Sequence, residues 1–156
     1  IYTLSLHDAL PIYKYPFRMR SETPDIAVEL PMQPNEAFEM DAVIMFSDIL
    51  TPPPALGIEF DVIRGKGPRI EEPIRDLQSV DRLKMLTDPN ERLGFVGETL
   101  GQLRSEITGT DATLIGFIGT PWTLAAYSIE GKATKNCLVT KVASTLLLFL
   151  MSLLRQ

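Results

Sequence analysis

Two short apolar runs dominate the hydrophobic pattern of the chain. They occupy residues 42–46 (AVIMF) and residues 112–119 (ATLIGFIG). Unbroken apolar runs that contain β-branched residues are typical of strands covered on both faces, as in a parallel sheet flanked by helices. We therefore predict two buried strands and, with a long helix between them, an α/β fold.

The long helix is predicted to begin at Asp88 and Pro89, with Glu91 completing a capping-box-like start. Apolar residues then recur at intervals of three and four, which marks one buried stripe: Leu93, Val96, Leu100, Leu103 and Ile107. Glycines follow directly after three members of this stripe, at Gly94, Gly97 and Gly101. Because glycine disfavours helix, we interpret them as a smooth strip that packs closely against a sheet.

Prolines mark the predicted starts and ends of the helices before the first strand. Thr23 and Pro24 are typical of a helix start, with threonine as the N-cap and proline in the first turn. Pro31 is expected to stop or kink this helix, because its ring clashes with the preceding turn and it has no N–H group. Pro34 would then open a second, short helix that leads into the first strand.

A hairpin is predicted between the first strand and the long helix. The three prolines of 51–54 are expected to prevent helix and to stiffen the loop before it. Residues 58–63 alternate apolar and polar side chains, which predicts an exposed strand, with 64–68 as the turn and 69–74 as the returning strand. A phosphate-binding loop at the glycines of this turn is disfavoured, because the Walker spacing is missing. A short helix is expected at 79–86.

The second strand is followed by another predicted helix, at 122–129. Thr120 and Pro121 again supply an N-cap and a first-turn proline. Tyr127 lies about two turns into this helix. Its plain interpretation is a core tyrosine whose hydroxyl is hydrogen-bonded.

Composition narrows the classes of partner and site. The net charge of −5 disfavours a nucleic-acid backbone as partner. Cys137 is the single cysteine and His7 the single histidine, which excludes an internal disulfide or a cysteine-rich zinc site and disfavours any dedicated metal site. This composition suits the cytosol or an organelle stroma. The longest apolar stretch, 146–154, is shorter than the roughly 20 residues that span a bilayer.

The two ends of the sequence differ from its middle. Residues 1–12 match neither helix nor strand periodicity, and we interpret them as a non-native, adaptor-like leader. Residues 142–156 form a divergent apolar tail. The domain to be explained is therefore 13–141.

Asp48 is the first candidate for chemistry. It stands where the first apolar run ends, and α/β folds bind ligands and carry out reactions at the carboxyl ends of their strands. A strand-terminal aspartate also commonly caps the following turn. Spacing alone leaves both interpretations open.

Several motifs resemble the uroporphyrinogen decarboxylase family, in its plastid or cyanobacterial form. They are FRMRSE at 17–22, QPNEAF at 33–38, FSDILTP at 46–52 and GKGP at 65–68. The most specific is GFIGTPWTLAAYSIEGK at 116–132. The resemblance covers 13–141 and concerns the N-terminal part of the family's chain.

The resemblance implies a (β/α)8 TIM barrel, of which 13–141 would supply the early βα units as an incomplete fragment. It implies a carboxy-lyase, usually a homodimer, that needs no metal or organic cofactor. The reaction would convert uroporphyrinogen III to coproporphyrinogen III by loss of four acetate carboxyl groups, in haem and chlorophyll biosynthesis. Similarity to plastid-type motifs favours the chloroplast stroma, with the cytoplasm as the alternative. No nucleic-acid or membrane partner is expected.

The resemblance also implies site residues. Asp48 matches the family's essential aspartate, whose carboxylate would stabilise a protonated, cationic pyrrole. Tyr127 matches its active-site tyrosine, which would position Asp48 or a substrate carboxylate. Further substrate contacts are implied at Ile44, Phe46, Ser47 and Phe117. Arg20 lies in a family motif and is expected to support the fold.

Departures from the family pattern keep other interpretations open. The family's carboxylate-binding motif RQAGRY belongs before Tyr13, where the adaptor-like residues stand, and its later Ser/Thr and His ligands belong beyond Gln156. We therefore expect this polypeptide to be inactive by itself, as an inert fragment or an interaction segment. A second enzymatic alternative is a zinc-dependent corrinoid or thiol methyltransferase of the same barrel superfamily, although GTPWTLAAY favours the decarboxylase.

Overall fold

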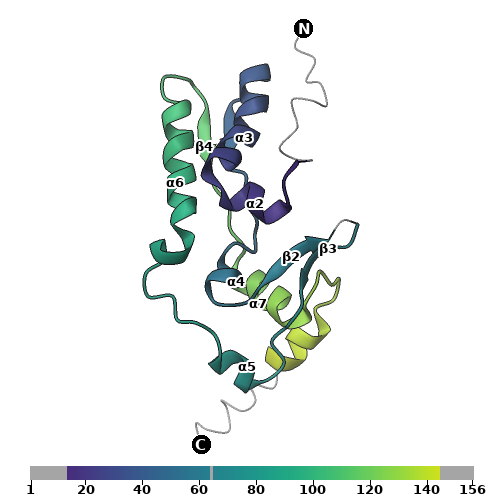
Figure 1. The fold of residues 1–156 in the computed structure, drawn as a ribbon. Helices are drawn as coiled ribbons and strands as arrows, with labels where there is room; N and C mark the ends of the chain where they lie inside the picture. Colours follow the sequence, from purple (N-terminus) through teal and green to yellow (C-terminus); the bar gives the residue numbers. More distant parts are fainter. Residues whose placement is uncertain (1–13, 64, 145–156) are drawn as a thin grey trace, which may run out of the picture.

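The computed structural model describes residues 14–63 and 65–144, in which helices alternate with short strands (Figure 1). β1 (Ala42–Ile44) pairs in parallel with β4 (Thr113–Ile115). β2 (Phe60–Ile63) pairs antiparallel with β3 (Gly67–Ile70). The described residues are therefore mixed α/β, as predicted, and contain two separate strand pairs with no closed sheet.

The parallel pair confirms the predicted strand–helix–strand unit. Its register places Ile44 opposite Ile115, and the Met45 N–H donates to the Ile115 carbonyl at 2.9 Å. Both strands are shorter than the apolar runs 42–46 and 112–119 that predicted them. α3 (Pro24–Phe38) and α6 (Asn90–Glu106) lie beside this pair (Figure 1).

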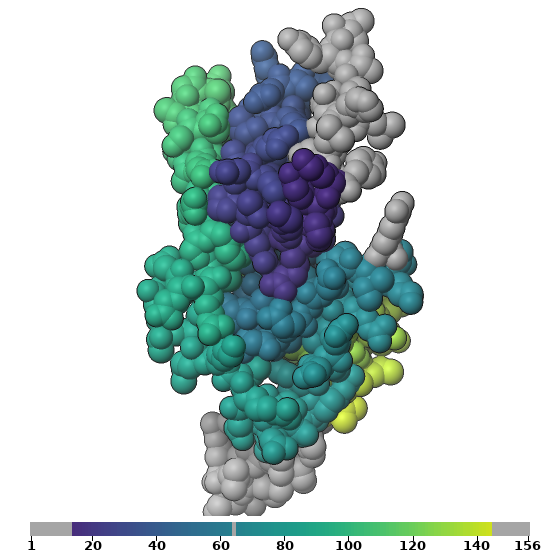
Figure 2. All heavy atoms as spheres, in the orientation of Figure 1, coloured from purple at the N-terminus to yellow at the C-terminus, as the bar shows by residue number. Residues whose placement is uncertain are grey.

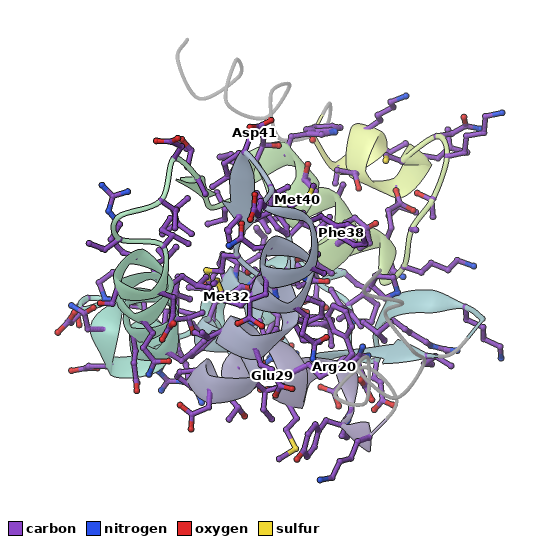
Figure 3. The ribbon with its side chains drawn as sticks, turned by 90° about the horizontal axis from the view of Figure 1, so that it is seen from above. Arg20, Glu29, Met32, Phe38, Met40 and Asp41 are labelled. Atoms are coloured by element: carbon purple, nitrogen blue, oxygen red, sulfur yellow. The ribbon has the colours of Figure 1, made fainter. Side chains whose placement is uncertain are left out.

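A first core cluster joins these two helices to the strands. Its buried members are apolar and come from α3, from β1 and the residue after it, and from α6 and its C-terminus: Met32, Val43, Met45, Leu103 and Ile107. Figure 3 shows Met32 on the side of α3 that faces α6. Val96 and Leu100 pack against this cluster, so four of the five residues of the stripe predicted for α6 face the core, whereas Leu93 lies at a kink in the helix.

The strand pair is covered on one face only, which corrects the prediction of burial on both. Val43 is 1% exposed, whereas its neighbour Ile44 is 54% exposed. Ile115 and Phe117 are 42% and 45% exposed. Successive side chains of a strand point to opposite faces, so the helices cover one face and leave the other open among the described residues. An unbroken apolar run could not reveal this, because it records hydrophobicity and not which neighbours are present.

The glycines of α6 also correct a prediction. A β-carbon placed at Gly94, Gly97 or Gly101 would meet nothing within 4 Å beyond its own helix. Each glycine lies one position after a stripe residue, which rotates it about 100° around the helix axis, away from the core. The close packing predicted for this strip is absent from the part of the chain that the structure describes.

α3 is a single helix with Pro31 and Pro34 inside it, so Pro31 does not stop the helix and Pro34 does not open a second one. An interior proline costs about 3 kcal/mol. Leu30 and Met32, on either side of Pro31, are buried, and their packing outweighs that cost. The preceding α2 (Phe17–Glu22) was not predicted as a helix.

The prolines of 51–54 were predicted to prevent helix, yet they begin the one-turn helix α4 (Pro52–Ala55). The first N–H groups of a helix have no intrahelical partner, so proline loses no hydrogen bond there. The prediction was wrong because proline disrupts the interior of a helix but not its first turn.

The predicted hairpin is confirmed, with β3 beginning inside the expected turn. Its register pairs Phe60 with Ile70 and Ile63 with Gly67, while residue 64 lies outside the described residues. A second core cluster forms beneath it from Leu50, Ile58, Phe60 and Ile70.

The start of α7 follows the predicted capping chemistry, the start of α6 follows it in part, and the start of α5 differs from the prediction. α5 (Leu77–Asp81) begins before the predicted 79–86, because the Asp76 carboxylate caps it by accepting the Ser79 N–H at 2.7 Å. The Asp88 carboxylate accepts the Asn90 N–H at 2.9 Å, but the N-cap position of α6 is Pro89. The predicted capping box with Glu91 does not form among the described residues. α7 (Pro121–Glu130) begins as predicted, with the Thr120 hydroxyl accepting the Thr123 N–H at 3.3 Å.

Figure 1 shows the two strand pairs in adjoining parts of the molecule. α2, α3 and α6 lie with the parallel pair in the upper part of Figure 1, and the hairpin, α5 and α7 occupy the lower part. Figure 2 shows the purple and blue residues of the upper part packed above the teal residues of the lower part. No helix in the described residues is long and apolar enough to cross a membrane. The predicted leader 1–12, with His7, and most of the predicted tail 142–156 lie outside the described residues.

Candidate active site

Asp48 lies in the turn that follows β1. Its Oδ1 accepts the Leu50 N–H at 2.6 Å, and its carbonyl oxygen accepts the Thr51 hydroxyl at 2.7 Å. This confirms the turn-capping interpretation of Asp48. No hydrogen bond reaches Oδ2 from any residue that the structure describes, so this oxygen keeps its capacity to accept a hydrogen bond.

Burial raises the pKa of Asp48, and the hydrogen bond from the Leu50 N–H opposes that shift only in part. Within the described chain, no lysine or arginine forms an ion pair with this carboxylate. A half-buried acid without a cationic partner is electrostatically suited to a ligand that brings positive charge.

The residues just before Asp48 make contacts of a different kind. The Phe46 ring packs against Phe17 of α2, with centroids 5.9 Å apart and planes tilted by 51°. The Arg20 guanidinium lies 5.2 Å from the Phe17 centroid and 5.9 Å from the Phe46 centroid. The hydroxyls of Ser47 and Thr51 lie 3.3 Å apart. The end of β1 is therefore held by an aromatic pair on one side and by a polar turn on the other.

The open face of the parallel pair brings together two of the predicted substrate contacts. Ile44 lies in register with Ile115, and Phe117, two residues beyond Ile115 and outside β4, is also exposed. Sequence reasoning missed Ile115. The spacing of 115 and 117 within the apolar run 112–119 was the signal that could have identified it.

Tyr127 lies on α7 and packs against the second core cluster, which contains Leu50 of the Asp48 turn. The Gly119 N–H donates to the Ile49 carbonyl at 3.2 Å and so joins the loop before α7 to that turn. Tyr127 and Asp48, both described by the structure, form no hydrogen bond with each other. The positioning role of Tyr127 stays a prediction.

Two cavities lie away from these residues. One of about 700 Å³ is lined by the hairpin and α5, including Phe60 and Leu83, and one of about 520 Å³ lies beside Lys66 and Arg69. None of the predicted site residues lines either cavity. The described residues also contain no group of three or more His, Cys, Asp or Glu side chains that could hold a metal ion. The candidate site is thus an open apolar face that ends at Asp48.

Comparison with known proteins gives a consistent match over most of the chain. A family model described as uroporphyrinogen decarboxylase (URO-D) matches residues 4–145. Proteins named uroporphyrinogen decarboxylase from Synechococcus sp. (strain CC9605) and Prochlorococcus marinus (strain MIT 9313) are 56% and 54% identical over 129 residues. A protein of the same name from Crocosphaera subtropica is 55% identical over 129 residues. These alignments cover 82% of this chain but 36% of each relative, so the chain spans about a third of their length.

Proposed function

The chain belongs to the uroporphyrinogen decarboxylase family, and from that premise we propose that it is part of an enzyme that converts uroporphyrinogen III to coproporphyrinogen III. The enzyme would be a carboxy-lyase of porphyrin biosynthesis that removes four acetate carboxyl groups without a metal or organic cofactor. The observation that carries the proposal is Asp48, half-buried and fixed by the Leu50 N–H at the end of an open apolar face.

The chemistry requires a fixed negative charge beside the pyrrole rings. Protonation of a pyrrole carbon gives a cation, which accepts the electron pair of the acetate C–C bond as carbon dioxide leaves. Protonation of the remaining methylene then gives a methyl group, and loss of the first proton from the ring carbon restores the neutral pyrrole. Asp48 would stabilise the cation through the pyrrole N–H groups, because its Oδ1 is held by the turn and its Oδ2 keeps its capacity to accept a hydrogen bond.

The apolar side chains of the open face would contact the macrocycle. Ile44, Phe46 and Phe117 are proposed as its contacts, with Ser47 beside the carboxylate. Exposure of Ile44 and Phe117 supports this assignment, because soluble proteins rarely leave grouped apolar side chains without a ligand or partner. Tyr127 is proposed to position Asp48 or a substrate carboxylate once the site is complete.

The decisive test is Asp48→Asn in the complete enzyme that carries this segment. Asparagine keeps an oxygen that accepts the Leu50 N–H, so the turn persists while the charge is lost. We expect turnover of uroporphyrinogen to fall by about 10²- to 10³-fold or more, with an unchanged circular dichroism spectrum. Asp76→Asn, at the N-cap of α5, is the matched control and should retain activity. Normal turnover by Asp48→Asn would remove Asp48 from the mechanism.

At the level of fold, we propose that 13–141 supply the early βα units of a TIM barrel, with 1–12 as an adaptor-like leader and 142–156 as a divergent tail. The open face of β1 and β4 would then point into the barrel. Two parallel strands cannot close an eight-stranded barrel, which supports the alternative that this polypeptide alone is an inert fragment. Expression of 13–141 by itself should then give insoluble or molten material, and a cooperative unfolding transition would contradict this.

A methyltransferase of the same superfamily is the second enzymatic candidate. The uninterrupted coding sequence separates the two: an upstream RQAGRY supports the decarboxylase, and a downstream set of zinc ligands supports the methyltransferase. We further propose a homodimer in the chloroplast stroma, with the cytoplasm as the alternative. The relatives named above are cyanobacterial. Sedimentation of the complete enzyme and localisation of a tagged copy test these two assignments.

A further inference from the structure

Arg20 has an unusual environment for a charged side chain. Its guanidinium lies over the rings of Phe17 and Phe46, and its Nε is buried with no hydrogen-bond partner. Figure 3 shows Arg20 on the side of the helices opposite to Met32 and the first core cluster. A buried donor without an acceptor costs free energy, so the unpaired Nε of Arg20 calls for an explanation.

Arg18, on the same helix, shows what a satisfied arginine looks like here. Its Nε donates to Glu22 at 2.6 Å, and one of its terminal nitrogens donates to Glu59 at 2.6 Å. Among the described residues no carboxylate takes the corresponding place beside Arg20. The difference between two arginines of one short helix therefore lies in their partners and not in their backbone.

Stacking on aromatic rings accounts for only part of the Arg20 geometry. A guanidinium over a ring is attracted through its flat face, while its N–H groups point outward in the plane. That in-plane edge matches a carboxylate, which can accept two parallel hydrogen bonds. Phe46 stands two residues before Asp48, so an anion bound by Arg20 would lie beside the proposed reaction site.

We propose that Arg20 binds a carboxylate of the tetrapyrrole substrate, an inference that rests on the proposed function. Uroporphyrinogen carries four acetates and four propionates, and it needs cationic partners as well as Asp48. Arg20 would anchor one carboxylate across the face of Phe46, while Asp48 meets the pyrrole N–H groups. The same chemistry could come from an Asp or Glu elsewhere in the complete protein, and the experiment below separates these two sources.

The test compares Arg20→Met, Arg20→Lys and the control Arg18→Met in the complete enzyme. The probe for binding is uroporphyrin, the fluorescent oxidised form of the substrate, and thermal unfolding is measured without ligand. We expect Arg20→Met to weaken uroporphyrin binding and raise KM by about 10- to 100-fold, with kcat within about threefold. Arg20→Lys should lie between, because it keeps the charge but not the planar fork. Arg18→Met should leave both constants unchanged.

Thermal unfolding distinguishes substrate binding from a purely structural role. Arg20→Met removes a buried donor that has no partner, which favours folding, and the stacking on Phe17 and Phe46, whose loss opposes it, so Tm should stay close to that of the wild type. A lower Tm with unchanged affinity would overturn the proposal, since it would assign Arg20 to the fold or to a carboxylate of the protein itself. If Arg20→Met fails to fold, normal affinity in Arg20→Lys would overturn it equally. A wild-type enzyme that neither binds uroporphyrin nor turns over uroporphyrinogen would instead reject the proposed function.

Discussion

The parallel unit (α3, β1, α6 and β4) and the hairpin unit (β2, β3 and α7) solve the problem of strand pairing in opposite ways. β1 must find a partner on the far side of α6, since Ala42 pairs with Thr113. β2 finds its partner at once, since Phe60 pairs with Ile70. The parallel unit buries one face and leaves the other open, and the candidate site lies at that open face. The open face of β1 and β4 is the surface on which we propose that the substrate binds.

Truncating one fully buried leucine to alanine in each region should have the largest effect on stability. Leu103→Ala in the parallel unit and Leu50→Ala in the second core cluster, against which the hairpin unit packs, are each expected to lower the free energy of unfolding by about 2–5 kcal/mol. If the units are separate, amide hydrogen exchange in the complete protein should quicken in α6, β1 and β4 for the first variant. For the second it should quicken in β2 and β3. Equal loss of protection everywhere in both variants would show one cooperative unit.

Gly119→Ala tests the junction between the units. A β-carbon there would lie 2.5 Å from the Ile49 carbonyl oxygen and 2.8 Å from Leu124 Cδ2. We expect a loss of about 1–3 kcal/mol in stability, because the backbone must shift. Gly116→Ala is the matched control, since its nearest such atom, Leu100 Cδ2, lies 3.9 Å away. Equal urea midpoints for the two variants would contradict this account of the junction.

The two threonine N-caps offer a smaller contrast. The Thr120 hydroxyl accepts the Thr123 N–H at the start of α7, whereas Thr23 caps α3 without a side-chain hydrogen bond. Thr120→Ala should therefore cost about 0.5–2 kcal/mol, and Thr23→Ala should cost less. Chemical denaturation of the two variants measures the difference, and a larger loss for Thr23→Ala would reverse the interpretation.

The smallest expected effect concerns the pH dependence of stability. Asp48 and Asp76 should contribute to it with opposite signs. Burial raises the pKa of Asp48, so its ionisation opposes folding. Asp48→Asn should thus gain stability relative to the wild type as pH rises above about 4, through the folded pKa of Asp48. Hydrogen bonds from Ser79 lower the pKa of Asp76, so its stabilisation is present above about 4 and is lost as pH falls through its folded pKa. Urea unfolding between pH 3 and pH 7.5 (roughly the range over which carboxyl groups titrate) checks both slopes; parallel slopes would contradict the assignment.

The sequence predicted best what depends on neighbouring residues. The start of α7 follows from the Thr120 cap, and α6 begins just after Asp88, whose carboxylate accepts the Asn90 N–H. These hydrogen bonds reach only two or three residues along the chain. The continuity of α3 through Pro31 could not be predicted, because it depends on packing of α3 against distant α6. The open face of β1 was missed for the same reason.

The candidate site divides in the same manner. The turn at Asp48 was foreseeable, because a strand-terminal aspartate commonly accepts an N–H two residues later. Arg20 carried only a motif in the sequence, and its buried Nε depends on how α2 meets the end of β1. A contact between residues of two elements, such as Arg20 and Phe46, can be recognised only in the folded structure.

The parallel register also has a consequence for biosynthesis. About 70 residues separate the paired positions of β1 and β4. At a synthesis rate of roughly 5–20 residues per second, β1 would emerge from the ribosome several seconds before its partner exists. During that interval an apolar strand edge is open to other chains, while the hairpin has already closed. Early helices such as α3 would then act as a temporary cover, and the order of elements along the gene becomes a protection against aggregation.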